Sequence, residues 1–212
     1  MSTPTDLRSR KRLATRQSIS NAATRLFLER GFDQVTVDEI AAAADVGRMT
    51  VFNHFPRKED MFFDRDQEIR ELLRDTLRQR DPQLAPVETL RLLAHRLVAE
   101  QSPYVSFSAA SQGFVETIEK SETLQARARA IRNELWQVVA EALADGAQRA
   151  HDDPDAQLAA GLLLATWTVA LIHAHRTFRL ARDTQQANAA FLAMVDKGSS
   201  GVKAAVAGTP YV

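Results

Sequence analysis

Apolar residues recur every three or four positions along most of this 212-residue chain. One long series consists of Leu124, Ala128, Ile131, Leu135, Val138 and Ala142. Such spacing places apolar side chains on one face of an α-helix, and the alternation typical of β-strands is scarce. Glycine and proline fall mostly between the periodic segments, where they end helices. The sequence therefore predicts an all-α fold of about nine helices without a sheet.

One helix start is marked by several signals at once. Thr36 is suited to the N-cap position, and Glu39 three residues later completes a capping box. Val35 before the cap and Ile40 in the first turn can form a hydrophobic staple. These signals agree with one another, so we predict a helix that begins directly after Thr36.

That helix belongs to a pattern of three. It ends near Ala44, and a tight turn over residues 45–47 leads into a second short helix that ends at Phe55, before Pro56. A longer helix over about residues 12–30 precedes both. Two short helices joined by a tight turn after a longer one are typical of a helix-turn-helix unit. We therefore predict a three-helix DNA-binding domain over residues 1–56.

The residues of this pattern resemble the DNA-binding signature of the TetR family. The matching stretch, residues 36–59, reads TVDEIAAAADVGRMTVFNHFPRKE, and with the preceding helix and its Arg30-Gly31-Phe32 ending the resemblance spans about residues 12–63. It implies an α-helical homodimer that binds a palindromic operator and usually represses until an effector releases it. The rest of the chain resembles the family in architecture only.

Three residues depart from the family pattern. Gly47 stands where Ser or Thr usually caps the second short helix, and glycine caps almost as well. Phe52 stands where a tyrosine hydroxyl often meets a phosphate, so we expect that contact to be missing. Met49 replaces a small residue, and its thioether either reaches a thymine methyl or hinders a close approach to the groove.

We expect the second short helix to read DNA. Val51 and Phe55 are four residues apart and should pack inward, which leaves the opposite face for the major groove. Asn53 suits a bidentate bond with adenine, and Arg48 suits guanine or a phosphate. The resemblance implies that Thr36, Thr50, His54 and Lys58 contact the DNA backbone, with Lys58 in the first turn of a long helix over residues 57–80. The predicted DNA-binding residues are Thr36, Arg48, Met49, Thr50, Asn53, His54 and Lys58. The alternative is that these side chains form an ordinary solvated helix surface.

Charge adds a local argument. The chain has 27 basic and 27 acidic residues, so attraction to nucleic acid must come from a patch. Such a patch consists of Arg8, Arg10, Lys11, Arg12 and Arg16, and its residues 8–12 form a basic N-terminal arm. This arm either adds phosphate or minor-groove contacts or is a disordered tail.

Residues 57–196 hold most of the aromatic residues, and we expect them to form an effector-binding and dimerisation domain. The candidate ligand contacts are Tyr104, Phe107, Phe114, Arg132, Trp136, Trp167 and His173. Ligand sites between helices are mainly apolar with few polar anchors, although an aromatic stripe also fits simple core packing. His173 and His175 point to different helix faces and cannot chelate one metal ion, so we expect neither a metal nor a cofactor.

Two long helices near the end of the chain are expected to form the dimer. The small residues Ala159, Ala160, Gly161, Ala165 and Ala170 permit close helix approach, and with the face of residues 187–195 they predict a two-fold four-helix interface. A dimer also suits DNA, since two recognition helices about 34 Å apart read successive major grooves. The Gly/Ser/Ala-rich residues 197–212 are predicted to be a flexible tail.

An uncharged stretch over residues 156–175 is long enough to span a bilayer. It contains polar residues and is rich in alanine, so a helix buried between other helices is the preferred interpretation and no membrane contact is expected.

The function predicted from these features is transcriptional regulation by a cytoplasmic homodimer that binds double-stranded operator DNA and an unidentified small-molecule effector. The alternative is a small-molecule-binding protein of this fold that does not bind an operator. An enzyme is not expected, because no P-loop, nucleophile elbow, HExxH or dinucleotide fingerprint occurs. The chain has no cysteine, which excludes disulfides, thiolate metal sites and cysteine nucleophiles.

Overall fold

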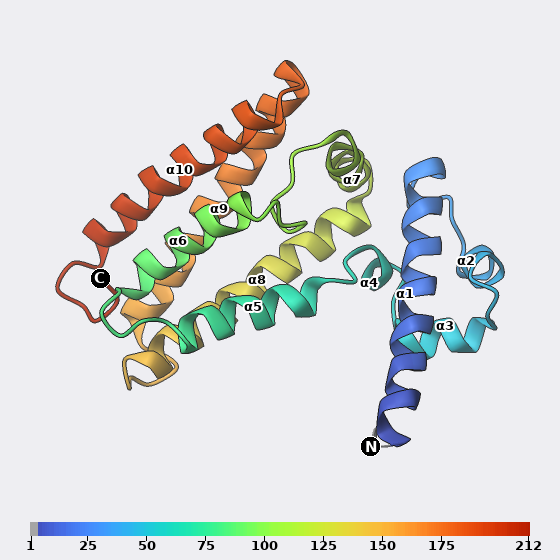
Figure 1. Ribbon diagram of the computed structural model, residues 1–212, viewed down its shortest axis with the longest axis horizontal. Helices are drawn as coiled ribbons and strands as arrows, with labels where there is room; N and C mark the ends of the chain where they lie inside the picture. The colour runs from blue at the N-terminus through green and yellow to red at the C-terminus, as the bar shows by residue number, and fades with distance from the viewer. Residues whose placement is uncertain (1–3) are drawn as a thin grey trace. The chain divides into compact units, whose positions relative to one another are not determined.

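The computed structural model describes residues 4–212, and these form helices without any strand (Figure 1). The helices are α1 (Pro4–Arg30), α2 (Val37–Ala43), α3 (Arg48–His54), α4 (Glu59–Phe62), α5 (Asp66–Arg78), α6 (Pro86–Ala99), α7 (Ala109–Glu119), α8 (Glu122–Gly146), α9 (Pro154–Ala181) and α10 (Thr184–Ala205). The predicted all-α class is confirmed.

The chain forms two compact units. The first contains the residues up to Arg65 together with Gly113–Ala128, and the second contains Asp66–Gln112 and Arg129–Val212. The first unit therefore extends beyond the predicted boundary at residue 56. It includes α4, most of α7 and the first turns of α8.

One helix predicted over residues 57–80 is in fact two. Helix α4 is a single turn that ends at Phe62, and α5 begins at Asp66. Met61 and Phe62 are buried in the core of the first unit, whereas Leu73 and Leu77 on α5 belong to the core of the second. Periodicity alone predicted one helix, because apolar spacing does not show which core each side chain joins.

The core of the first unit is built around α1. Ile19, Ala23 and Phe27 lie on one face of α1 and are fully buried. Gly31 then adopts a φ of +85°, a left-handed conformation that glycine adopts without a Cβ penalty and that ends the helix. Phe32 turns back so that its ring lies 4.9 Å from that of Phe27. This predicted end of the first helix is confirmed.

The predicted capping box of α2 is also present. The Thr36 hydroxyl oxygen accepts from the backbone N–H of Glu39 at 3.3 Å, and the Thr36 N–H donates to the Glu39 carboxylate at 2.8 Å. Val35 and Ile40 are both buried, as the hydrophobic staple requires. Local sequence signals thus determine where α2 begins.

Helices α9 and α10 run side by side in the second unit (Figure 1). A Cβ added at Gly198 of α10 would overlap the side chain of Thr166 on α9, so the two backbones lie very close at this point. Ala187, Phe191 and Val195 of α10 are fully buried. This close approach lies within one chain and at a glycine of the segment that was predicted to be a flexible tail.

This packing corrects the predicted dimer surface. Ala159, Ala160 and Ala170 are fully buried inside the chain, as is the α10 face of Ala187, Phe191 and Val195. The outward faces carry Leu158, Ala165, Val169 and Ile172 on α9 and Ala189, Ala193, Ser200 and Gly201 on α10, so Ala165 is the predicted small residue that remains exposed.

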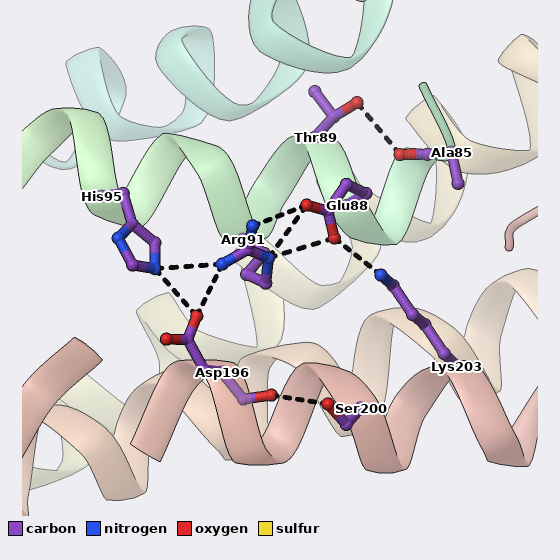
Figure 2. Close-up of polar contacts among 8 residues, drawn as sticks. All are labelled: Ala85, Glu88, Thr89, Arg91, His95, Asp196, Ser200 and Lys203. Carbon is purple, nitrogen blue, oxygen red and sulfur yellow. Dashed lines mark hydrogen bonds and ion pairs between the residues drawn. The ribbon is translucent and has the colours of Figure 1, made fainter. Parts of the chain in front are cut away.

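Helix α6 is joined to α10 by a polar network (Figure 2). Arg91 of α6 donates to Glu88 on its own helix at 2.7 Å and to Asp196 of α10 at 2.8 Å. Lys203 of α10 donates to Glu88 at 2.6 Å, and the His95 ring lies 2.8 Å from the Asp196 carboxylate. The network therefore crosses between the two helices at three points.

The C-terminal residues are ordered, and the predicted flexible tail is wrong. Helix α10 continues to Ala205, and Val202, Val206 and Tyr211 are almost completely buried. The Tyr211 hydroxyl donates to Asp153 at 3.2 Å, and the backbone carbonyl of Tyr211 accepts from the N–H of Val87 at 3.3 Å. Composition predicted a tail, but a few widely spaced apolar residues are enough to anchor the segment to the core.

Helix α9 is the one helix within residues 4–212 that is long and apolar enough to cross a membrane. The core helix of a soluble protein passes the same test. Its inner face, which includes Leu163 and Phe178, is buried, whereas Val169 and Ile172 on the outer face are about half exposed. The helix is thus buried along one side only, and its second apolar side is open in the isolated chain.

Candidate nucleic-acid interface

Helix α3 is held to the first unit by one face and exposes the other. Val51 and Phe55 are fully buried, which confirms the predicted inward pair. Arg48, Met49 and Asn53 are exposed, and the side chain of Met49 is 71% accessible. The two faces are separated because 100° of rotation per residue places i and i+4 together and the residues between them outward.

The exposed Arg48 is held by neighbouring side chains. Its Nη1 donates to both oxygens of Asp38 on α2, at 3.2 and 2.9 Å. Its guanidinium carbon also lies 5.5 Å from the centre of the Phe52 ring, within the range of a cation–π contact. Asp38 and Arg48 are ten residues apart, so no local sequence pattern predicts this pair.

Thr36 is exposed but is already engaged by its capping box. Besides capping α2, its hydroxyl donates to the Glu39 carboxylate at 2.8 Å. Arg30 forms an ion pair with the same carboxylate at 2.7 Å. The hydrogen bonds from the backbone and side chain of Thr36, followed by that from Arg30, lower the pKa of Glu39 to about 2. Glu39 is therefore ionised at neutral pH and stabilises the start of α2.

The C-terminal end of α3 is bound by α1. Arg16 donates from Nη1 to the carbonyl of His54 at 2.6 Å, and its guanidinium lies 4.0 Å above the Phe55 ring. Burial, followed by the positive charges of Arg12 and Arg16, lowers the pKa of His54. Arg16 thus satisfies a free carbonyl at the helix end and contributes the favourable charge for that end. Thr50, the other residue predicted beside the groove, is half-buried on α3.

Lys58 differs most from its predicted role. Its Nζ donates to the carbonyls of Phe32 at 2.7 Å and Val35 at 2.9 Å and lies 4.1 Å from the centre of the Phe32 ring. Desolvation lowers its pKa from the ordinary lysine value. The ammonium group therefore faces the loop between α1 and α2, whereas the sequence predicted a phosphate contact at the start of a long helix. The two carbonyl acceptors lie more than 20 residues earlier in the chain, so no local sequence pattern predicts this contact.

The candidate ligand residues are not gathered at one place. Phe114 lies in the first unit, where its ring stacks on Phe62 with centroids 4.2 Å apart. Phe107 is fully buried and contacts Phe191 and His175, so it is a core residue of the second unit. An aromatic pattern in the sequence does not distinguish these two cores.

The remaining candidates lie at or near the surface of the second unit. Arg132 and His173 are exposed, and the Tyr104 hydroxyl donates to Glu68 at 2.6 Å. Trp136 is partly exposed and donates from Nε1 to the carbonyl of Gln157 at 3.0 Å, whereas Trp167 packs edge-on against Phe191. Among residues 4–212 no three His, Asp or Glu side chains are grouped so that they could hold a metal ion.

An open cavity of about 570 Å³ lies between α5 and α6 in the second unit. Its lining residues are Leu72, Asp75, Thr76, Gln79, Arg80, Asp81, Leu84, Thr89, Leu92, Leu93 and Arg96. None of the candidate ligand residues is among them. The volume falls within the range of about 300–1,000 Å³ that is usual for ligand sites.

Helices α2 and α3, supported by α1, form a helix-turn-helix unit in which α3 has an exposed face. Proteins of this class insert the second helix of the unit into a groove of DNA. Residues 19–64 match the family model described as "Bacterial regulatory proteins, tetR family". This match covers the helix-turn-helix region, where the motif predicted a resemblance to the TetR family.

Two curated relatives match the same region. The HTH-type transcriptional regulator TcmR of Streptomyces glaucescens is 42% identical over 55 residues, which are 26% of this chain and 24% of the relative. The HTH-type transcriptional repressor BepR of Brucella suis biovar 1 (strain 1330) is 48% identical over 48 residues, 23% of each chain. The matches span about a quarter of the length of these relatives.

Solved structures resemble nearly the whole chain in fold. A SmeT–triclosan complex has a TM-score of 0.58 at 19% identity and covers 89% of this chain and 91% of its own. Salmonella enterica GusR has a TM-score of 0.56 at 22% identity, with 91% and 95% covered. Thermus thermophilus FadR in complex with lauroyl-CoA has a TM-score of 0.53 at 23% identity, with 88% and 92% covered. At these identities the likeness shows the fold alone.

Proposed function

We propose that this protein is a cytoplasmic, sequence-specific transcriptional regulator, acting as a repressor, that binds a palindromic operator as a homodimer. The observation that carries the proposal is the exposed face of α3, where Arg48, Met49 and Asn53 project from a helix anchored by buried Val51 and Phe55. The names of both curated relatives, a regulator and a repressor, support it. Regulation of transcription requires no catalytic group.

Asn53 and Arg48 are the proposed base-reading residues, because an amide pairs with adenine and a guanidinium with guanine in two-bond geometry. Thr36, Thr50 and His54 are proposed as backbone contacts, and the arm of Arg8, Arg10, Lys11 and Arg12 adds positive charge along α1. Lys58 is proposed to act indirectly, by holding the loop between α1 and α2.

The test is selection of binding sites from a random duplex library with the full-length protein. We expect an inverted repeat to be enriched, and Asn53→Ala to lose about 1–3 kcal/mol of discrimination at one base pair of each half-site. Asn133→Ala, the same substitution at an exposed position of α8 in the second unit, is the matched control and should bind as wild type does. Enrichment of no sequence by folded wild-type protein would contradict operator binding and favour a regulator-like fold that only binds small molecules.

A small-molecule effector is proposed to bind the second unit and release the operator. The proposal is supported by two proteins of similar fold, SmeT in a complex with triclosan and Thermus thermophilus FadR in a complex with lauroyl-CoA. The cavity between α5 and α6 is the proposed place, because it combines leucine side chains with Arg80 and Arg96. An effector that prefers the arrangement unable to bind DNA lowers operator affinity by its differential affinity for the two states.

The effector proposal is tested by thermal-shift screening of apolar and amphiphilic acids, followed by operator titration with each compound that stabilises the protein. Leu92→Trp should fill part of the cavity and abolish the shift. A compound that binds Leu92→Trp and wild type equally would place the effector elsewhere.

A further inference from the structure

Arg48 is the first residue of α3, and two neighbours constrain its side chain. Asp38 binds Nη1 through both carboxylate oxygens, and the Phe52 ring lies beside the guanidinium. Both members of the ion pair remain accessible, with 59% of the Arg48 side chain and 65% of the Asp38 side chain exposed. A long cation on the proposed DNA-reading face is therefore held in place while its remaining donors stay open.

The position of Asp38 is itself well defined. Asp38 lies in the first turn of α2, between the two members of the Thr36–Glu39 capping box. Arg30 of α1 binds Glu39 at 2.7 Å and connects that turn to the first helix. The carboxylate that holds Arg48 thus projects from a helix start that three separate contacts stabilise.

An exposed arginine on this face can contact DNA in two ways. A guanidinium can bind a phosphate, or it can place two parallel N–H donors against O6 and N7 of guanine. With Nη1 directed to Asp38, the Nε–Nη2 edge remains available for a two-bond contact. A phosphate drawn to the same guanidinium would lie close to the Asp38 carboxylate and be repelled, whereas the guanine edge carries no net charge.

From this geometry we propose that Asp38 is a positioning residue that directs Arg48 toward guanine in the major groove and away from the DNA backbone. The pair would then specify one G·C base pair in each operator half-site. This inference rests on the proposed function, because it requires that α3 reads an operator.

The test uses full-length protein and the random duplex library, with Asp38→Asn as the main variant. We expect wild type to enrich a guanine at one position of each half-site and Asp38→Asn to lower that preference about tenfold. Since the released Arg48 gains access to a phosphate, the salt dependence of binding should steepen by about 0.9 in slope per subunit. Glu29→Gln, the same charge change at an exposed site of α1, should alter neither quantity.

Three further variants separate positioning from general effects. Arg48→Ala should remove the guanine preference, and adding Asp38→Asn to it should change nothing more. Asp38→Glu keeps the charge and should restore part of the preference that Asp38→Asn loses. Circular dichroism melting should show that all variants are folded, as expected for two exposed side chains.

The outcomes distinguish this inference from the function on which it rests. If wild type enriches no sequence, operator binding itself is contradicted and the inference falls with it. If wild type enriches an operator but Asp38→Asn keeps the full guanine preference, or Arg48→Ala does, only the role of Asp38 and Arg48 is overturned.

Discussion

Gly198 and Gly201 lie in the interior of the same helix, α10, but differ in their surroundings. A Cβ at Gly198 would overlap Thr166 of α9, whereas a Cβ at Gly201 meets nothing within 4 Å. Alanine is favoured over glycine in a helix by about 1 kcal/mol. The overlap with Thr166, and not helix propensity, should therefore decide whether Gly198→Ala raises or lowers the free energy of unfolding.

We expect Gly198→Ala to lower the free energy of unfolding by about 1–3 kcal/mol, the usual cost of overpacking a tight contact. Gly201→Ala is the control and should raise it by about 0.5–1 kcal/mol. Urea denaturation followed by circular dichroism measures both. Equal effects of the two substitutions would show that α9 and α10 do not approach as closely as described.

Lys58 offers a second residue-scale prediction. Its ammonium donates to two carbonyls, so Lys58→Met should cost about 1.5–3 kcal/mol of stability, the range for hydrogen bonds to a charged group. Its neighbour Arg57 forms a loose ion pair with Asp60 at 3.4 Å and is mostly exposed. Arg57→Met should therefore cost less than about 0.5 kcal/mol. Thermal melting of both variants decides whether Lys58 supports the fold or faces solvent.

At the scale of elements, the network of Figure 2 makes the pairing of α6 and α10 sensitive to pH. The hydrogen bond from Arg91, followed by that from Lys203, lowers the pKa of Glu88 to about 2 from its ordinary value of 4.5. The pKa of Asp196 is also lowered, by its hydrogen bonds to His95 and Arg91, against an opposing effect of burial. Because the folded pKa of Glu88 lies below the unfolded value, its contribution to stability is complete above about pH 4.5 and is lost as pH falls toward 2.

We expect Glu88→Gln to remove about 1–2 kcal/mol of stability at pH 7 and less near pH 2, since solvent screening reduces the value that the pKa shift alone implies. Urea denaturation at several pH values measures the difference from wild type. Glu122→Gln, at an exposed residue in the first turn of α8, is the control. A constant difference across this pH range would mean that Glu88 is not paired in solution.

At the scale of the whole molecule, the open apolar side of α9 is the feature that an isolated chain does not explain. Leu158, Val169 and Ile172 are exposed there, and α10 adds the small exposed residues Ala189 and Ala193. Exposed apolar faces of this kind mark protein–protein interfaces. A two-fold partner that supplies the same helices would bury this apolar side of α9. Such an arrangement fits the proposed homodimer.

Ile172→Glu should therefore convert the dimer to a monomer of 23.6 kDa, because a carboxylate at the centre of an apolar interface loses its hydration without a partner. Light scattering coupled to size-exclusion chromatography measures the mass. Leu92→Glu, an exposed leucine on α6, should leave the mass unchanged. A wild-type monomer at micromolar concentration would contradict the proposed interface.

The sequence by itself determined the features that depend on a few neighbouring residues. The start of α2 at Thr36, the end of α1 at Gly31 and the inward pair Val51 and Phe55 all follow from cap chemistry or helical spacing. For the same reason the family signature could be recognised, since its residues lie close together along the chain. The exposed face of α3 was predictable because it is the complement of a short buried stripe.

Only the tertiary structure decided which distant groups meet. It assigned Phe114 to the first unit, turned Lys58 toward the carbonyls of the loop between α1 and α2, and paired Asp38 with Arg48. It also ordered the C-terminal segment through Tyr211, which composition alone suggested would be mobile. Periodicity shows that a side chain is buried or exposed, but the partner is set by how helices pack, and that depends on the summed contacts of the whole chain.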